Sequence, residues 1–229
     1  MSAPEQPPAW ARRVGRLLAH GVWRTAVLGA EHVPTEGPVV VVANHIGLMD
    51  GPVLVGALPR PVAVLVREGM FVGPLGTLLR ASGQISVGAD DGGRSALAAA
   101  RSHLRGGGAV AVFPEGSRGR GDASDARAGA AWLALNAQAP VVPAAVLGAR
   151  RTGESVHRVP GPRRRLAVVF GAPVRVERPA GVPGREALAR ANETVRTALA
   201  AVVAEAVERT GIPLPTDDPL AERRGRMDR

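Results

Sequence analysis

Residues 39–51, VVVVANHIGLMDG, place a histidine and an aspartate just after an apolar run. Asp50 lies five positions beyond His45, and on a continuous helix such positions diverge by about 140°, so the two side chains need a turn to meet. A carboxylate within reach of an imidazole fixes its tautomer and stabilises the imidazolium that forms when the other nitrogen takes a proton. The pair is therefore a candidate general base.

The spacing of His45 and Asp50 is weak evidence alone, because one such pair is expected by chance in roughly one chain of this kind in six. Two structural interpretations stay open from these residues. Asp50 can cap the helix that follows it, and His45 can be a partly buried histidine bonded to the backbone.

A second apolar run, GGAVAVF at 107–113, ends in PEGSRGRGD. Ligands of parallel α/β sheets bind outside the carboxyl ends of the strands, so both segments can reach one crevice. Arg118 can clasp a phosphate with its forked guanidinium, and the backbone N–H groups of Gly116 and Ser117 can approach the same anion. Glu115 can hydrogen-bond a polar acceptor or hold Arg118.

Together these segments resemble a known family. NHIGLMD resembles the N-H-x4-D motif, and FPEGSR the F-P-E-G-T/S-R motif, of the glycerolipid acyltransferases, the 1-acylglycerol-3-phosphate acyltransferase (PlsC-like) group. The resemblance extends from about Val27 to Gly148 and includes LGAEHVP, VREGMFVGPLGTLLRASGQISV and VVPAAV. Two motifs in the expected order are far more specific than either one.

The resemblance implies transfer of a fatty acyl chain from acyl-CoA or acyl-carrier protein to the hydroxyl of a lysophospholipid. The foremost acceptor is 1-acylglycerol-3-phosphate, giving phosphatidic acid, and the donor is a co-substrate with no resident cofactor. The catalytic residues it implies are His45 and Asp50. The substrate-binding residues it implies are Glu115, Gly116, Ser117 and Arg118. Members of the family commonly have a lysine near the position of Arg67, which makes Arg67 a further phosphate or interface contact; a solvated charge at the end of a strand is the alternative.

One position departs from the family pattern. After GQISV the family places an arginine two residues on, where this chain has Gly88 and then Ala89. A phosphate contact is therefore missing there, and an acceptor other than 1-acylglycerol-3-phosphate, such as another lipid or an unusual alcohol, is the alternative within the same chemistry.

The rest of the sequence alternates between apolar runs and helix-compatible segments. Runs typical of buried strands lie at 38–43, 62–66, 84–87, 109–113, 141–147 and 166–170. Helical segments lie near 52–58, 74–82, 92–105, 124–138 and 184–211. This order predicts an α/β fold with a largely parallel or mixed central sheet flanked by helices.

We expect an N-terminal segment at 1–27, an acyltransferase domain at 28–211 and a flexible tail at 212–229. The first segment has apolar residues at helical spacing among arginines, and they are Trp10, Val14, Leu17, Leu18 and Trp23. Such an amphipathic helix either lies in the headgroup layer of an anionic membrane or packs on the domain. Residues 128–149 carry no charge, but their prolines predict a helix followed by a buried strand rather than a membrane span.

The net charge of +9, carried by 29 basic residues that are all arginine, favours an anionic partner. A nucleic-acid-binding protein is disfavoured, because aromatic residues make up only 3% of the chain and offer few stacking platforms. The absence of cysteine excludes thiol chemistry and fits a peripheral protein at the cytoplasmic face of a membrane. The remaining histidines lack ligand-spaced partners, so no metal site is expected.

Overall fold

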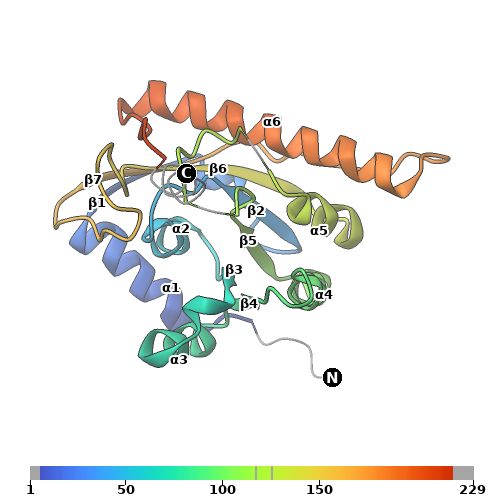
Figure 1. The fold of residues 1–229 in the computed structure, drawn as a ribbon, viewed down its shortest axis with the longest axis horizontal. Helices are drawn as coiled ribbons and strands as arrows, with labels where there is room; N and C mark the ends of the chain where they lie inside the picture. The colour runs from blue at the N-terminus through green and yellow to red at the C-terminus, as the bar shows by residue number, and fades with distance from the viewer. Residues whose placement is uncertain (1–5, 117, 125, 219–229) are drawn as a thin grey trace, which may run out of the picture.

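The computed structural model describes residues 6–116, 118–124 and 126–218. Within these parts of the chain, one sheet contains seven strands in the order β1-β7-β6-β2-β5-β3-β4 (Figure 1). The strands are β1 (Arg24–Leu28), β2 (Val39–Ala43), β3 (Ala63–Arg67), β4 (Ile85–Val87), β5 (Ala109–Val112), β6 (Val141–Leu147) and β7 (Arg165–Phe170). The β6 and β7 strands pair antiparallel, and the other neighbouring pairs of this sheet are parallel. The predicted α/β fold is confirmed.

The sheet is buried on both faces because its central strands are apolar at every position. All five residues of β2 are buried, and alternate side chains point to opposite faces of the strand. Val40 and Val42 pack with one layer of helices, while Val39 and Val41 pack with the other.

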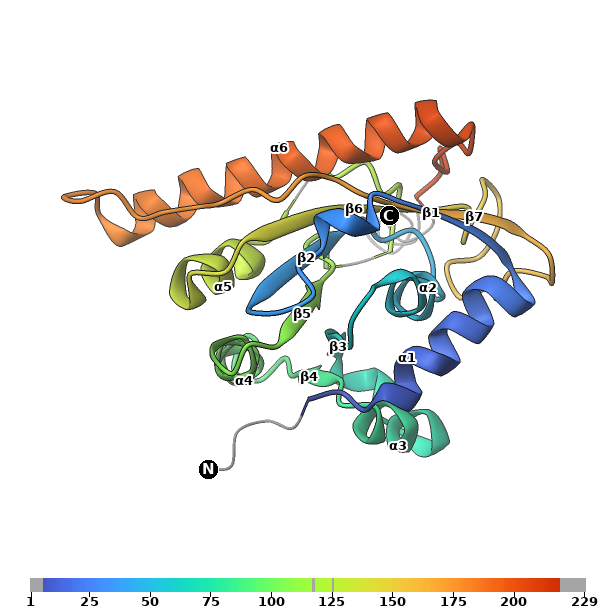
Figure 2. The same ribbon diagram turned by 180° about the vertical axis from the view of Figure 1, so that it is seen from behind.

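Helices cover both faces of the sheet. They are α1 (Ala9–Arg16), α2 (Asp50–Ala57), α3 (Gly73–Ala81), α4 (Arg94–Arg105), α5 (Gly129–Ala137) and α6 (Gly184–Thr210). Helices α4, α5 and α6 contribute to one apolar cluster, and α2 contributes to the other. Figure 1 shows α6 as the long orange helix along the sheet, and Figure 2 shows α1 beside α2 on the opposite side, with α3 near the start of α1.

The N-terminal segment joins the sheet earlier than expected. Helix α1 continues as a π-helical turn over Leu17–Val22, and β1 then pairs with β7. The boundary expected between residues 27 and 28 therefore falls inside β1. The sequence pattern missed this strand because its five residues, RTAVL, are only partly buried.

The uncharged stretch at 128–149 divides, as predicted, into the helix α5 and the buried strand β6. In the part of the chain that the structure describes, no helix has the length and apolar character needed to cross a bilayer.

The chain after α6 returns to the domain. Ile212 and Leu214 pack against the core, and Asp217 binds Arg150. This differs from the flexible tail expected for 212–229 at its first residues, whereas residues 219–229 lie outside the described parts of the chain.

Candidate active site

His45 and Asp50 meet across a tight turn at the carboxyl end of β2. Asp50 is the first residue of α2, and its carboxylate is fully buried. One carboxylate oxygen, Oδ2, accepts hydrogen bonds from the backbone N–H groups of Ile46 (2.7 Å) and Gly47 (2.8 Å) and lies 2.8 Å from His45 Nδ1. Asp50 thus closes the turn behind it and makes no side-chain cap on α2, whose N-cap position is Met49. The helix-capping interpretation of Asp50 is wrong.

The ring of His45 is held in one orientation with one nitrogen left available. Its Nδ1 faces the carboxylate of Asp50, and the ring stacks on Phe113 with centroids 4.3 Å apart. Hydrogen bonding to Asp50 assigns the proton to Nδ1, so Nε2 carries the lone pair that accepts a proton. The side chain is 15% exposed, which leaves a route to a bound substrate.

The loop after β5 lies against this turn because β5 pairs with β2 in the sheet. The Glu115 carboxylate accepts a hydrogen bond from the backbone N–H of His45 at 3.2 Å. The backbone N–H of Gly119 donates to the carbonyl of His45 at 3.0 Å. The structure therefore brings two segments that lie seventy residues apart in the chain to one place.

Glu115 holds its proton far more tightly than an ordinary glutamate. Burial raises the pKa of Glu115 from 4.5 to about 8, and the negative charges of Asp122, Asp50 and Asp218 add to this increase. The hydrogen bond from the His45 N–H opposes it. Glu115 is therefore largely neutral at pH 7 and can donate a hydrogen bond to an anion without repelling it.

Arg118 lies near Asp50 and Arg67, with its Nε buried and without a hydrogen-bond partner among the described residues. Burial lowers the pKa of Arg118, the charge of Asp50 raises it and that of Arg67 lowers it. The guanidinium stays protonated at neutral pH. A buried donor without a partner is costly, so this position favours an incoming anion.

Arg67 reaches the same loop from the end of β3. Its Nη2 donates to the carbonyl of Gly116 at 2.8 Å, and the side chain is exposed. Gly116 has a φ of 68°, and a Cβ there would come within 2.6 Å of Arg127 Nε, so only glycine fits. Ser117, which the resemblance also implied, lies outside the described residues.

Two further residues build the site. The buried side chain of Asn44 donates to the carbonyls of Gly121 and Val146 and accepts from the N–H of Val146. Arg150 is 1% exposed, although the arginine- and glycine-containing sequence of residues 148–165, GARRTGESVHRVPGPRRR, is typical of a basic surface loop. In the sequence, the position of Asn44 next to His45 could have indicated its part in the site. Nothing in the sequence distinguishes Arg150 from the other arginines.

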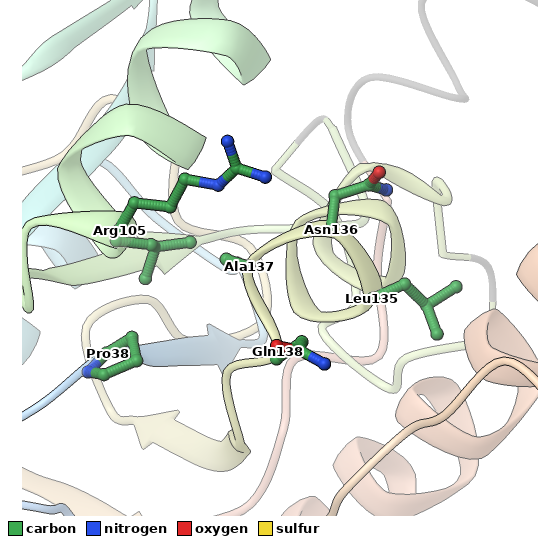
Figure 3. A pocket seen from close by; sticks show the side chains of 7 residues that line it. Pro38, Arg105, Leu135, Asn136, Ala137 and Gln138 are labelled. Carbon is green, nitrogen blue, oxygen red and sulfur yellow. The ribbon is translucent and has the colours of Figure 1, made fainter.

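The hollow in Figure 3 is not part of this site. It has a volume of about 450 Å³ and is lined by residues that include Pro38, Arg105 and Gln138. Pro38 precedes β2, whereas His45 follows it. The hollow therefore lies at the amino ends of the strands, opposite the candidate active site at their carboxyl ends.

The acyltransferase family model matches residues 24–147, just over half of the chain and all of the segments that form the site apart from Arg150. The chain belongs to the acyltransferase family. It is 35% identical over 119 residues to the human 1-acyl-sn-glycerol-3-phosphate acyltransferase beta, covering 46% of this chain and 40% of that protein. It is also 29% identical over 187 residues to an uncharacterised protein of Mycobacterium tuberculosis, covering 74% of this chain and 49% of that one.

Among solved structures, the acyltransferase fold of this chain is similar to the 1-acyl-sn-glycerophosphate acyltransferase PlsC of Thermotoga maritima. The TM-score is 0.63 and the sequence identity 22%, covering 83% of this chain and 77% of that one, so the likeness concerns the fold. The chain spans less than half the length of the curated relatives named above. The predicted resemblance to the glycerolipid acyltransferases is confirmed at the level of the family.

Proposed function

We propose that this acyltransferase moves a fatty acyl chain from acyl-CoA or acyl-carrier protein to the hydroxyl of a lysophospholipid, foremost 1-acylglycerol-3-phosphate. The observation that carries the proposal is the juxtaposition of His45, whose Nδ1 faces Asp50 at 2.8 Å, with the buried Nε of Arg118, which has no hydrogen-bond partner among the described residues. A base and a cation on adjoining loops suit an acceptor that has both a hydroxyl and a phosphate.

In the proposed reaction His45 Nε2 removes the proton of the acceptor hydroxyl as its oxygen attacks the thioester carbonyl. The tetrahedral oxyanion then collapses, the carbon–sulfur bond breaks, and the imidazolium returns the proton to the departing thiolate. A thiol has an ordinary pKa of about 8.5, so the leaving group needs little acid assistance and the base step carries more weight. Asp50 keeps the Nδ1 proton in place throughout.

The acceptor phosphate is proposed to bind between Arg118 and Glu115, with Arg67 at the edge. Arg118 supplies a forked cation, and the largely neutral carboxyl of Glu115 supplies a donor rather than a repelling charge. The names of the human relatives fit this acceptor. Ala89, which stands where the family has an arginine, favours the alternative that another lipid or alcohol is accepted.

Arg118→Met is expected to raise the KM for 1-acylglycerol-3-phosphate by about 10- to 100-fold, because a charge-assisted hydrogen bond to phosphate is lost. Transfer of labelled acyl-CoA to 1-acylglycerol-3-phosphate and to 1-acylglycerol, which lacks the phosphate, measures this. The KM for 1-acylglycerol should not change in the variant.

Arg105→Met is the matched control, since Arg105 is an exposed arginine at the opposite edge of the sheet. If the unaltered protein had the same kcat/KM for 1-acylglycerol-3-phosphate and 1-acylglycerol, the proposal that the acceptor binds through its phosphate would be contradicted. Failure to acylate any lysophospholipid or alcohol would contradict the proposed reaction itself.

We also propose that α1 and the turn after it rest on an anionic membrane surface. Trp10, Val14 and Leu17 are exposed on this segment, and Leu17 is 67% exposed. Trp23 and Leu18 pack on the domain, so the segment is both fixed to the fold and apolar toward solvent. Arg13 and Arg16 in the last turn of α1 supply charge for lipid phosphates.

Leu17→Glu is expected to weaken binding to phosphatidylglycerol-containing vesicles by about 10-fold or more, because an exposed leucine that would enter the lipid layer is replaced by a charge. Vesicle sedimentation measures this. Val159→Glu is the matched control, because Val159 is 57% exposed but lies in the loop before β7. Equal losses in the two variants would contradict a docking surface on this segment.

A further inference from the structure

Arg150 is a buried cation that binds three distant segments of the chain as well as its own loop. It follows β6, and the turn at Gly148 sends it inward: Gly148 has a φ of 85°, and a Cβ there would lie 2.6 Å from the carbonyl of Arg165. The guanidinium makes five hydrogen bonds, to acceptors on Ile46, Gly119, Glu154 and Asp217. A buried guanidinium is tolerated because its donors are satisfied in this way.

Two of these acceptors lie on the loops of the candidate active site. Arg150 Nε donates to the carbonyl of Ile46 at 2.9 Å, and Ile46 is the residue after His45. Arg150 Nη2 donates to the carbonyl of Gly119 at 2.9 Å, and Gly119 is the residue after Arg118. One planar group therefore joins the loop of the base to the loop of the phosphate-binding cation.

Asp217, beyond the end of α6, keeps this guanidinium in place. Its carboxylate lies 2.9 Å from Arg150 Nη1, and its backbone carbonyl accepts from Nη2 at 2.9 Å. The second carboxylate oxygen accepts from the N–H of Gly153. The negative charge offsets the cost of burying the guanidinium, so the segment after α6 is coupled to the active-site loops.

We propose that Arg150 is a positioning residue for the acyl transfer, held by Asp217, that sets the distance between His45 and Arg118. The inference rests on the proposed function. Arg150 makes no hydrogen bond to the His45 ring or to the Asp50 side chain among the described contacts, so it acts through the backbone of the two loops. Its loss should change where the acceptor phosphate sits relative to the base while leaving the base intact.

The test compares Arg150→Met and Asp217→Asn with Arg164→Met as the matched control. Arg164 belongs to the same loop region and pairs with Glu154, but none of its hydrogen bonds reaches the two active-site loops. Asp217 is 21% exposed, so Asp217→Asn tests the inference even where Arg150→Met fails to fold.

We expect Arg150→Met to lower kcat/KM by about 100-fold and Asp217→Asn by about 10-fold, since a displacement of about 1 Å at the reacting groups has effects of this size. The acceptor KM should rise and kcat should fall, whereas the pH profile keeps its shape because the His45 and Asp50 pair is untouched. Simple loss of folded protein lowers kcat and leaves the KM unchanged, so the KM distinguishes positioning from stability. The double variant should be no worse than Arg150→Met alone, since both act through one cation.

Native-state hydrogen exchange of the protein without substrate provides a readout that needs no activity. Amides in peptides covering 44–50 and 113–121 should exchange about 10-fold faster in the Arg150 and Asp217 variants and not in Arg164→Met. Exchange and acceptor KM equal to those of the unaltered protein would overturn the inference. If the unaltered protein transfers no acyl group, the proposed function fails while exchange still decides whether Arg150 ties the loops.

Discussion

Replacing His45 with alanine is expected to lower the rate of acyl transfer by about 10³-fold or more, because the proposed general base, which would remove the hydroxyl proton, is lost. The fold should persist, since His45 is partly exposed and lies in a turn whose hydrogen bonds from Ile46 and Gly47 to Asp50 remain. Single-turnover transfer from labelled acyl-CoA, with circular dichroism and the Tm measured on the same protein, tests both statements.

His157→Ala is the matched control, because His157 is an exposed histidine in the loop before β7 and should transfer at the normal rate. Asp50→Asn should fall between the two, since the imidazole survives but its tautomer is no longer fixed. A folded His45→Ala protein with near-normal transfer would contradict general-base catalysis by this residue.

The fold class and six of the seven strands could be predicted from the sequence, because these strands are short apolar runs bounded by polar and glycine-containing loops. Valine-rich runs such as residues 39–43 match strands buried on both faces, and the helical segments between them require parallel connections. The same rule predicts that the carboxyl ends of parallel strands meet at one end of the sheet, and the pairing of β2 with β5 in the structure brings His45 to Glu115.

Contacts between distant segments were not predictable in the same way. Strand β1 has too weak a pattern to be recognised without its partner β7. Arg150 is one of 29 basic residues, and its burial depends on carbonyls and a carboxylate from three distant segments that the sequence does not place. Asp50 lies at the start of a helix, where acidic residues often act as caps, yet the turn before it offers its carboxylate two N–H groups.

The unusual protonation of Glu115 leads to the second large effect, on stability. The pKa of Glu115 is about 8 in the folded protein against an ordinary value of 4.5, so the folded state binds a proton that the unfolded state has released between these values. The contribution of Glu115 to the free energy of unfolding is therefore greatest below pH 4.5 and falls as the pH rises toward 8. The slope that Glu115 contributes is about 1.4 kcal/mol per pH unit across the window, a total on the order of a few kcal/mol.

Glu115→Gln is expected to remove this slope, because the amide stays neutral and its oxygen can still accept the hydrogen bond from the His45 N–H. Denaturant unfolding at pH 5 and pH 8 measures the effect as a gain in stability for the variant that is larger at pH 8. The two proteins differ only at residue 115, so the difference between their free energies of unfolding reports the effect of that residue. Asp122→Asn should reduce the slope without abolishing it, since the charge of Asp122 raises the pKa of Glu115 but burial contributes more.

An equal stability difference between Glu115→Gln and the unaltered protein at both pH values would show that Glu115 is ionised in the fold, and the phosphate would then face a repelling carboxylate.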